Sequence, residues 1–278
     1  MVRIYEYQHP DWGIVFKKIR KAFRDYAPIW VEWVDRMEDS DIQIVHIVGL
    51  GEVEVALQSK NLVLFQECYK TAGNYAWDTL WEKSLLTVSF YDLPKETDKK
   101  FNFLYLPFGY DSNIYYNFND YSRANLVFAT GHVAETEHLD KIYQACKKAK
   151  YLFIHTGEDF KFGESYLYLE YMSEVDFRNL LNQVSYVFGL RAIEGFEVAV
   201  LEGIACGATG VVPTLPSYDW YDELAIRIDI ESPNLEENIY NILKNKEKIA
   251  VNKEKLAQFS WANIMRRFYN ELWQLLKE

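Results

Sequence analysis

Two hydrophobic periods alternate along this chain. Short runs rich in Val, Ile, Leu and aromatic residues predict strands, and stretches with apolar residues three and four apart predict helices. The predicted strands are 3–7, 29–34, 41–48, 61–65, 85–89 and 103–106, followed by 126–129, 151–155, 166–171, 186–189 and 209–213. The predicted helices are 14–26, 52–59, 77–83, 139–148, 174–182, 196–205, 235–246 and 261–277. The alternation of strand and helix predicts an α/β protein with parallel sheets covered on both faces.

One stretch interrupts this alternation. Residues 107–121 are polar, rich in Asn and Tyr, and only weakly periodic, which is typical of a connection between domains. A second strand and helix series starts after it. We therefore predict two similar α/β halves, although the sequence holds no internal repeat.

Composition narrows the class of protein. The chain has 278 residues, of which 49% are hydrophobic and 26% charged, as in a globular protein with a real core. Its net charge of −11 disfavours nonspecific binding to nucleic-acid phosphates, so no nucleic-acid partner is strongly indicated.

Cysteine usage and hydropathy bear on the compartment. Cys68, Cys146 and Cys206 stand far apart and form no CxxC pair, which favours reduced thiols. We see neither a signal peptide ahead of the first strand nor an apolar run as long as a membrane span. The expected location is the cytoplasm.

Residues 191–207 carry the most informative pattern. They predict a turn that opens a helix, with Glu194 at the helix start and Glu202 two turns further on. Eight helical residues rise about 12 Å, roughly the distance between the sugar and the ribose of a nucleotide-sugar. Because helix N-termini attract phosphate, this segment has the parts to hold a diphosphate, a sugar hydroxyl and a ribose. In the alternative interpretation, Glu194 caps the helix and Glu202 lies on a solvated face.

The surrounding residues favour the functional interpretation and resemble a known family. The block Glu194-Gly-Phe-Glu-Val-Ala-Val-Leu-Glu202-Gly-Ile-Ala-Cys-Gly207 is similar to the E-x7-E block of retaining, GT-B-fold glycosyltransferases of the family 4 type. Leu106–Asp111 resembles the turn between that family's domains, and Phe128–Gly131 resembles the start of its second Rossmann domain. Phe259-Ser-Trp261 resembles the start of its final helix. The resemblance covers most of the chain.

The resemblance implies a role for each matching position. Glu194 is expected to bind hydroxyls of the donor sugar, and Glu202 the ribose hydroxyls. Backbone N–H groups of the residues after Glu194 are expected to face the sugar and the diphosphate. The donor-binding residues implied in this way are Gly13, Gly131, His132, Tyr171, Gly195, Phe196, Glu197 and Glu202.

The positions that hold the diphosphate in the family depart from its pattern here, and Glu197 stands where the family prefers Gly. The family places an Arg after Gly131 and a Lys five residues beyond it, and this chain has His132 and Glu137 there. Protonated His132 would partly replace the Arg, and either Lys141 or Arg191 would replace the lost positive charge. A catalytically inactive protein that binds a nucleotide or glycan, and an epimerase or phosphorylase of the same fold, are the alternatives left open.

Histidine and metal chemistry complete the candidate site. His46 ends the third predicted strand, and the carboxyl ends of parallel strands face the ligand crevice in doubly wound folds. We predict Glu194 and His46 as the catalytic residues, against the interpretation that His46 is a strand-end residue without a role. The sequence shows no metal-ligand spacing, so we expect a reaction without a metal.

The segment Phe16–Tyr26 predicts a basic amphipathic helix. Its apolar positions 16, 19, 23 and 26 form one stripe between lysines and arginines. Such a helix either packs on its own sheet or contacts a membrane surface near a lipid-linked acceptor, as in some relatives.

Together these patterns predict a GT-B protein with two Rossmann-like domains facing a cleft. The predicted domains are 1–108 on the acceptor side and 109–258 on the nucleotide-sugar side, with 259–278 crossing back to the first domain. The predicted activity is retaining transfer from a nucleotide-sugar co-substrate to a hydroxyl of a glycan, lipid or protein, without a further cofactor.

Overall fold

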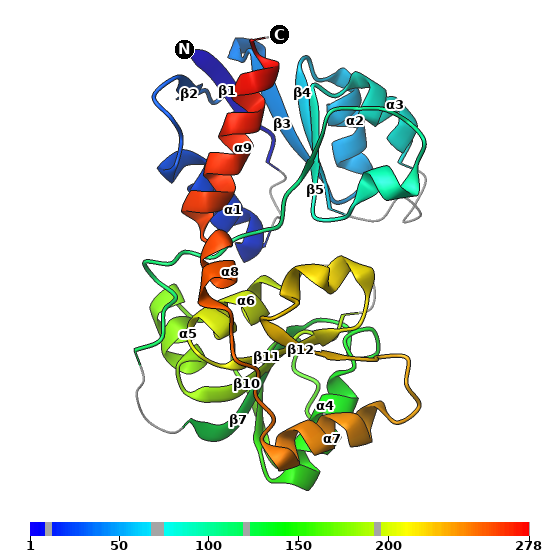
Figure 1. The fold of residues 1–278 in the computed structure, drawn as a ribbon, viewed down its shortest axis with the longest axis vertical. Coiled ribbons are helices and arrows are strands. Elements are labelled where there is room, and N and C mark those ends of the chain that lie inside the picture. The colour runs from blue at the N-terminus through cyan, green and yellow to red at the C-terminus, as the bar shows by residue number, and fades with distance from the viewer. Residues whose placement is uncertain (9–12, 68–74, 119–122, 192–195, 278) are drawn as a thin grey trace. The chain divides into compact units, whose positions relative to one another are not determined.

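The computed structural model describes the chain except residues 9–12, 68–74, 119–122, 192–195 and 278. The contacts divide the chain into two compact units (Figure 1). The first unit comprises Met1–Gly109 together with Trp261–Glu278, and the second comprises Tyr110–Ser260.

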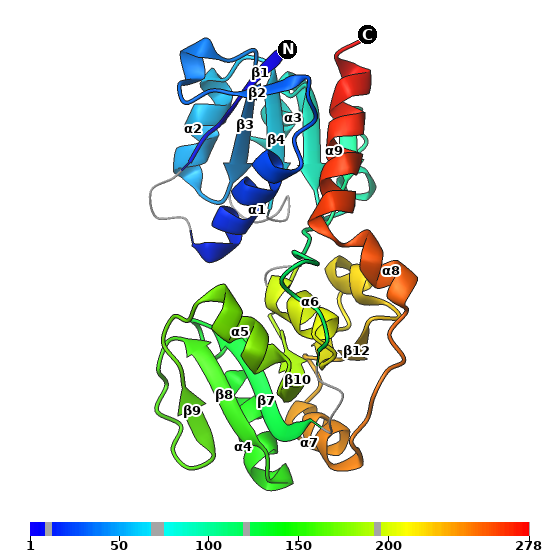
Figure 2. The same ribbon diagram turned by 90° about the vertical axis from the view of Figure 1, so that its left-hand side faces the viewer.

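The first unit is built on a parallel six-stranded sheet in the order β2-β1-β3-β4-β5-β6. The strands are β1 (Val2–Glu6), β2 (Val31–Trp33), β3 (Ile42–Ile47), β4 (Leu62–Gln66), β5 (Leu86–Ser89) and β6 (Phe103–Tyr105). The helices are α1 (Ile14–Asp25), α2 (Leu50–Gln58), α3 (Trp77–Lys83) and α9 (Trp261–Leu275), with short 3-10 turns at Met37–Asp39 and Leu93–Glu96. Helices α1 and α9 cover one face of this sheet, and α2 and α3 cover the other (Figure 2).

Aromatic packing fixes α1 and α9 to the sheet. Phe23 of α1 is fully buried, and its ring centroid lies 5.2 Å from that of Phe268 on α9 and 5.6 Å from that of Phe65 on β4. The hydroxyl of Tyr269 donates to the carbonyl of Phe23 at 2.6 Å. The last helix of the chain is therefore part of the core of the first unit.

The second unit has a second parallel six-stranded sheet, in the order β12-β11-β10-β7-β8-β9. The strands are β7 (Ala124–Gly131), β8 (Leu152–Gly157), β9 (Tyr166–Tyr168), β10 (Val184–Phe188), β11 (Thr209–Pro213) and β12 (Ala225–Ile228). The helices are α4 (Leu139–Ala149), α5 (Glu174–Leu181), α6 (Val198–Ala205), α7 (Leu235–Asn245) and α8 (Lys253–Gln258), with a 3-10 turn at Pro216–Tyr221.

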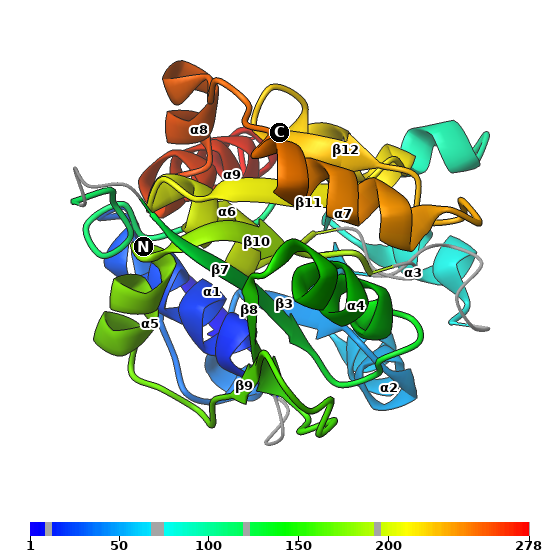
Figure 3. The same ribbon diagram turned by 90° about the horizontal axis from the view of Figure 1, so that it is seen from below.

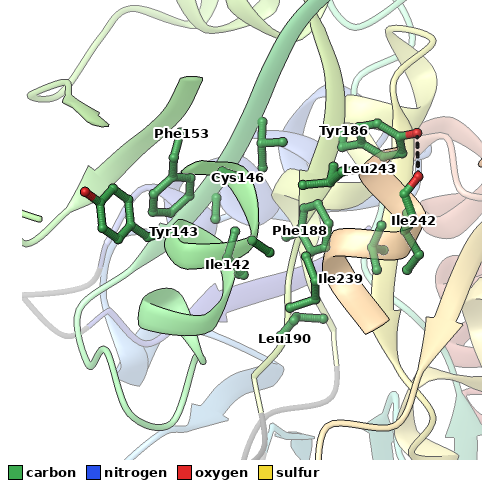
Figure 4. Packing of buried hydrophobic residues seen from close by; sticks show 14 of the residues in the cluster. Ile142, Tyr143, Cys146, Phe153, Tyr186, Phe188, Leu190, Ile239, Ile242 and Leu243 are labelled. Carbon is green, nitrogen blue, oxygen red and sulfur yellow. Dashed lines mark hydrogen bonds between the residues drawn. The ribbon is translucent and has the colours of Figure 1, made fainter. Parts of the chain in front are cut away.

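Helices α4 and α7 lie side by side on one face of this sheet (Figure 3). Figure 4 shows the core beneath them, in which Ile142 and Cys146 of α4 meet Phe153 of β8 and Phe188 of β10. The hydroxyl of Tyr186 donates to the carbonyl of Glu247 at 2.9 Å, just beyond α7. The opposite face is covered by α5 and α6.

The predicted α/β class with two parallel sheets is confirmed. Strand β12 and helix α8 were not predicted. Strand β12 has four residues at the sheet edge, and Arg227 in its middle breaks the apolar pattern. The guanidinium of Arg227 donates to the carbonyls of Pro213 and Leu215, both at 2.9 Å, so a polar residue is well satisfied there.

Candidate functional site

The strand order of the second unit defines one topological switch point. Strands β7 and β10 are neighbours, but the chain leaves β7 toward β8 and leaves β10 toward β11. The helices that follow, α4 and α6, lie on opposite faces of the sheet. The loops therefore diverge at the carboxyl ends of β7 and β10, where open α/β sheets form their ligand crevice.

Three charged side chains meet at this point. A carboxylate oxygen of Glu137 lies 2.7 Å from Nη2 of Arg191, and a carboxylate oxygen of Glu197 lies 3.4 Å from Nε of the same guanidinium. The other oxygen of Glu137 accepts from the backbone N–H of Val133 at 3.0 Å. Glu137 and Glu197 are both buried, which makes a paired arginine necessary for either charge.

Glycines allow these carboxylates to lie against the strand ends. A Cβ on Gly131 would lie 1.9 Å from a carboxylate oxygen of Glu137, and a Cβ on Gly189 would lie 2.5 Å from Cγ of Glu197. Gly157, at the end of β8, has a φ of +118°, and its Cβ would lie 1.9 Å from the carbonyl oxygen of Gly131. Larger residues at these positions would displace the charged side chains or the backbone itself.

Helix α6 begins at this edge, directly after Glu197. The carbonyl of Glu197 accepts from the N–H groups of Val200 and Leu201 at 3.1 and 3.2 Å, and from the hydroxyl of Tyr221 at 2.7 Å. Gly203 lets α6 approach β10, because an added Cβ would lie 2.5 Å from Val187. Gly203 thus allows the close packing of α6 on the sheet.

Glu202 lies on the buried side of α6 and is 1% exposed. Burial, and then the charge of Glu202, raises the pKa of the Cys206 thiol to about 12. The same two causes raise the pKa of the buried Tyr115 hydroxyl. The Glu202 side chain therefore does not lie on the solvated face that the alternative interpretation assigned to it.

The remaining donor-binding predictions are scattered within the second unit. Phe196 is mostly buried, with its ring 5.3 Å from that of Tyr221. His132 is exposed in the loop after β7, and Tyr171 is 80% exposed beyond β9, which β8 separates from β7. Glu194 and Gly195 lie outside the described residues.

The carboxyl edge of the first unit's sheet holds a second polar cluster. His46 of β3 is fully buried, with Nδ1 2.6 Å from a carboxylate oxygen of Glu67 and Nε2 3.8 Å from one of Glu6. Glu6 in turn pairs with Arg24 of α1 at 2.9 Å. The ring of His46 stacks on Phe65 at 4.5 Å. The sequence placed His46 at this edge, but neither glutamate was singled out.

Gly13 and helix α1 follow β1 along the chain. Gly13 precedes α1 with φ −69°, and a Cβ there would meet nothing within 4 Å. The apolar stripe of the helix is buried through Ile19 and Phe23, so it packs on its own sheet. A membrane contact of α1 would have to use its basic face.

The described part of the chain holds no group of three or more His, Cys, Asp or Glu residues arranged to hold a metal ion. None of its helices is long and apolar enough to cross a membrane.

Neither a protein-family model nor a curated protein sequence matches this chain. Several solved structures do match it. A structure of Anabaena HepE in complex with UDP-glucose aligns with a TM-score of 0.72 at 13% identity, covering 99% of this chain and 100% of that one. Sucrose-phosphate synthase from Thermosynechococcus elongatus aligns with a TM-score of 0.71 at 12% identity, over 97% of this chain and 81% of that one.

A third match is longer than this protein. The pneumococcal O-GlcNAc transferase GtfA, in complex with UDP and GlcNAc, aligns with a TM-score of 0.64 at 13% identity. The alignment covers 85% of this chain but only 57% of that enzyme. At these identities the likeness concerns the fold. The chain accordingly has the GT-B fold, with two Rossmann-like units.

Proposed function

We propose that this protein transfers a sugar from a nucleotide-sugar donor to a hydroxyl acceptor. The observation that carries the proposal is the switch point of the second unit, where α6 opens beside β7 and β10 with Glu202 buried within it. Helix N-termini and strand ends of this kind hold phosphate groups in many α/β proteins. The matching structure of HepE contains UDP-glucose, and that of GtfA contains UDP and GlcNAc. Uridine nucleotides are therefore the first donors to test.

The proposed roles follow the segment from Arg191 to Gly207. Glu194 binds hydroxyls of the donor sugar, and Glu202 binds the ribose. The backbone N–H groups of Gly195, Phe196 and Glu197 stabilise the negative charge that develops on the leaving diphosphate, which is the main electrostatic contribution to the rate. His132 and Gly131 line the same edge, and Tyr171 lies nearer the base.

The first unit supplies the acceptor side in this proposal. Gly13 and His46 both lie at or after strand ends of its sheet. His46 is the proposed catalytic group there, and Glu67, at 2.6 Å, fixes its orientation. The reaction proceeds with retention and without a metal. The acceptor is a hydroxyl of a glycan, lipid or protein, and the basic face of α1 is suited to an anionic membrane surface.

The decisive experiment measures transfer and binding together. The wild-type protein is incubated with a panel of nucleotide-sugars, and released nucleoside diphosphate is measured with and without acceptor hydroxyls. Glu202→Gln preserves the volume of this buried side chain and removes its charge. We expect it to lose at least tenfold in affinity for UDP, because charged hydrogen bonds to the ribose contribute about 1.5 to 3 kcal/mol.

The matched control is Glu231→Gln, which removes an exposed carboxylate of the same unit. It should leave UDP binding unchanged. Equal affinities of the wild type and Glu202→Gln, with equal melting temperatures, would remove the proposed ribose contact. If no nucleotide-sugar of the panel binds and none yields nucleoside diphosphate, the proposed transferase activity is wrong.

One observation favours a second function. Glu137 is buried where the resembling family carries a Lys, so the diphosphate region contains an additional negative charge. A protein that binds a nucleotide or glycan without turnover is consistent with this. Calorimetry with nucleotide-sugars, run beside a donor-hydrolysis assay, separates the two functions, since only the transferase releases nucleoside diphosphate faster than the control without enzyme.

A further inference from the structure

The carboxylate of Glu137 lies in surroundings that suit an anion. It accepts from the N–H of Val133 at 3.0 Å and lies 2.7 Å from Nη2 of Arg191. Gly131 leaves the room for it, since a Cβ there would overlap the carboxylate. Backbone N–H groups, glycine and a guanidinium are the components of many phosphate sites.

The charge balance of this cluster is unfavourable for a second anion. One guanidinium faces the carboxylates of Glu137 and Glu197, at 2.7 and 3.4 Å, which leaves the three side chains with a net charge of −1. All three are largely removed from solvent, so water screens these charges poorly. A diphosphate that approaches Arg191 has to compete with carboxylates already held there.

Lys141 is the other cation that the sequence offered for this region. Its ammonium lies 3.4 Å from a carboxylate oxygen of the neighbouring Asp140, and 46% of the side chain is exposed. Exposed pairs of this kind contribute little and are screened by salt. Of these two cations, Arg191 is therefore the one that lies in the cluster with Glu137 and Glu197.

We propose that Arg191 is the cation of the diphosphate subsite and that Glu137 is an internal anion that competes with the diphosphate for it. This assignment rests on the proposed nucleotide-sugar chemistry. Glu137 thereby weakens the binding of nucleoside diphosphate, the product that a transferase must release. In this assignment Arg191 contacts the ligand, and Glu137 acts only through Arg191.

Calorimetry on the full chain tests the competition with three probes: UDP, inorganic pyrophosphate and uridine. Glu137→Gln keeps the shape and the acceptor for Val133 but removes the charge. We expect it to bind UDP and pyrophosphate about tenfold more tightly, because the Arg191 guanidinium no longer has a charged partner to give up before it pairs with the phosphate. Arg191→Ala should weaken both about tenfold or more, and uridine should bind alike to all variants.

The double variant Glu137→Gln/Arg191→Ala tests whether the effect of Glu137 depends on Arg191. If Glu137 acts by competing for Arg191, its removal gives no gain once Arg191 is absent. Asp140→Asn and Lys141→Ala are the matched controls, because they alter exposed charges on α4. Both should bind all three probes as the wild type does.

Several results would overturn the assignment. They are unchanged or weaker UDP binding by Glu137→Gln, an equal gain in the double variant, or no binding of pyrophosphate and UDP by any variant. Melting temperatures of each variant show whether a loss reflects unfolding, and the gain expected for Glu137→Gln is not produced by unfolding. Tighter pyrophosphate binding without any sugar release would retain this inference and refute the transferase. Sugar transfer by the wild type, with unchanged UDP and pyrophosphate affinities in Glu137→Gln, would support the transferase and refute this inference.

Discussion

The carboxyl edges of the two sheets each bury a glutamate paired with an arginine. In the first unit, Glu6 pairs with Arg24 at 2.9 Å, and the guanidinium of Arg24 lies 4.5 Å from the centre of the Trp33 ring. In the second unit, Glu137 pairs with Arg191 at 2.7 Å. The charges are the same, but their surroundings differ.

Aromatic rings and a histidine enclose the first pair, whereas glycines and backbone N–H groups border the second. His46, 3.8 Å from Glu6, contacts the rings of Phe16, Phe23 and Phe65. Rings hold a pair in one arrangement, while a glycine-lined edge lets a second anion approach. A buried ion pair therefore indicates a binding site only together with the backbone around it.

The largest expected effect concerns the glycine-lined edge. Gly157→Ala places a Cβ at φ +118° and 1.9 Å from a backbone oxygen, so the backbone of β7 or β8 has to move. We expect a loss of at least about 3 kcal/mol in unfolding free energy, as for strained positions without a flexible neighbour. Gly13→Ala, at φ −69° with nothing within 4 Å, should change stability by less than about 0.5 kcal/mol.

Urea unfolding measured by far-UV circular dichroism tests both variants. Equal midpoints for Gly157→Ala and the wild type would show that the edge of the second unit is looser than its contacts indicate. A large loss in Gly13→Ala would show that the first unit's edge also depends on a glycine.

The next effect concerns the enclosed pair. Glu6→Ala leaves Arg24 and His46 without their shared carboxylate, and breaking a buried pair costs about 3 kcal/mol. Because the Arg24 side chain is 31% exposed, solvation reduces the expected loss to about 2 kcal/mol. Tryptophan fluorescence reports mainly the unfolding of the first unit, since all tryptophans except Trp220 belong to it. UDP binding should remain unchanged, and a tenfold weaker binding would assign Glu6 to the site.

The sequence predicted the helices and strands of both units better than it predicted which side chains contact one another. Trp77–Lys83 and Thr209–Pro213 were predicted to the residue, because each has a clear period and clear breaks. His46 was placed at a strand end for the same reason. Its partners Glu6 and Glu67 come from two other strands and the residues after them, so no local pattern joins them.

The same limit applies to the proposed binding site. Arg191 was one of two cations that the sequence offered, and only the fold brings it to Glu137 instead of Lys141. The burial of Glu202 also depends on how α6 packs against the sheet. Which cation meets Glu137, and whether Glu202 is buried, depends on tertiary contacts. The hydrophobic periodicity of the sequence carries no information about these contacts.

Acidification tests the second unit through its buried histidine His155. Burial lowers the pKa of His155, in β8, from its usual 6.5 to about 4, so the folded protein favours the neutral ring. Unfolded chains bind this proton below about pH 6.5, so the contribution is complete above that pH and declines as the pH falls toward 4. We expect a loss of about 1 kcal/mol by pH 5.5.

His155→Gln should flatten that part of the pH profile, measured as unfolding free energy between pH 7.5 and 5. His132→Gln, at the exposed position after β7, should flatten the profile only slightly, because burial is the first cause of the lowered pKa of His155 and the charge of His132 the second. An identical decline in His155→Gln and the wild type would assign the pH dependence to other groups.

The smallest expected effects compare two tyrosine hydroxyls that tie helices to each core. Tyr269 donates to the carbonyl of Phe23 at 2.6 Å in the first unit, and Tyr186 donates to the carbonyl of Glu247 at 2.9 Å in the second. The Tyr186 hydroxyl also lies 3.4 Å from the carbonyl of Ile242. Each change to Phe removes one hydroxyl donor and should cost about 0.5 to 1 kcal/mol. Tryptophan fluorescence should detect the loss in Tyr269→Phe and not in Tyr186→Phe, whereas circular dichroism should detect both. If fluorescence midpoints shift equally in both variants, the units unfold as one, and the two edges cannot be perturbed independently.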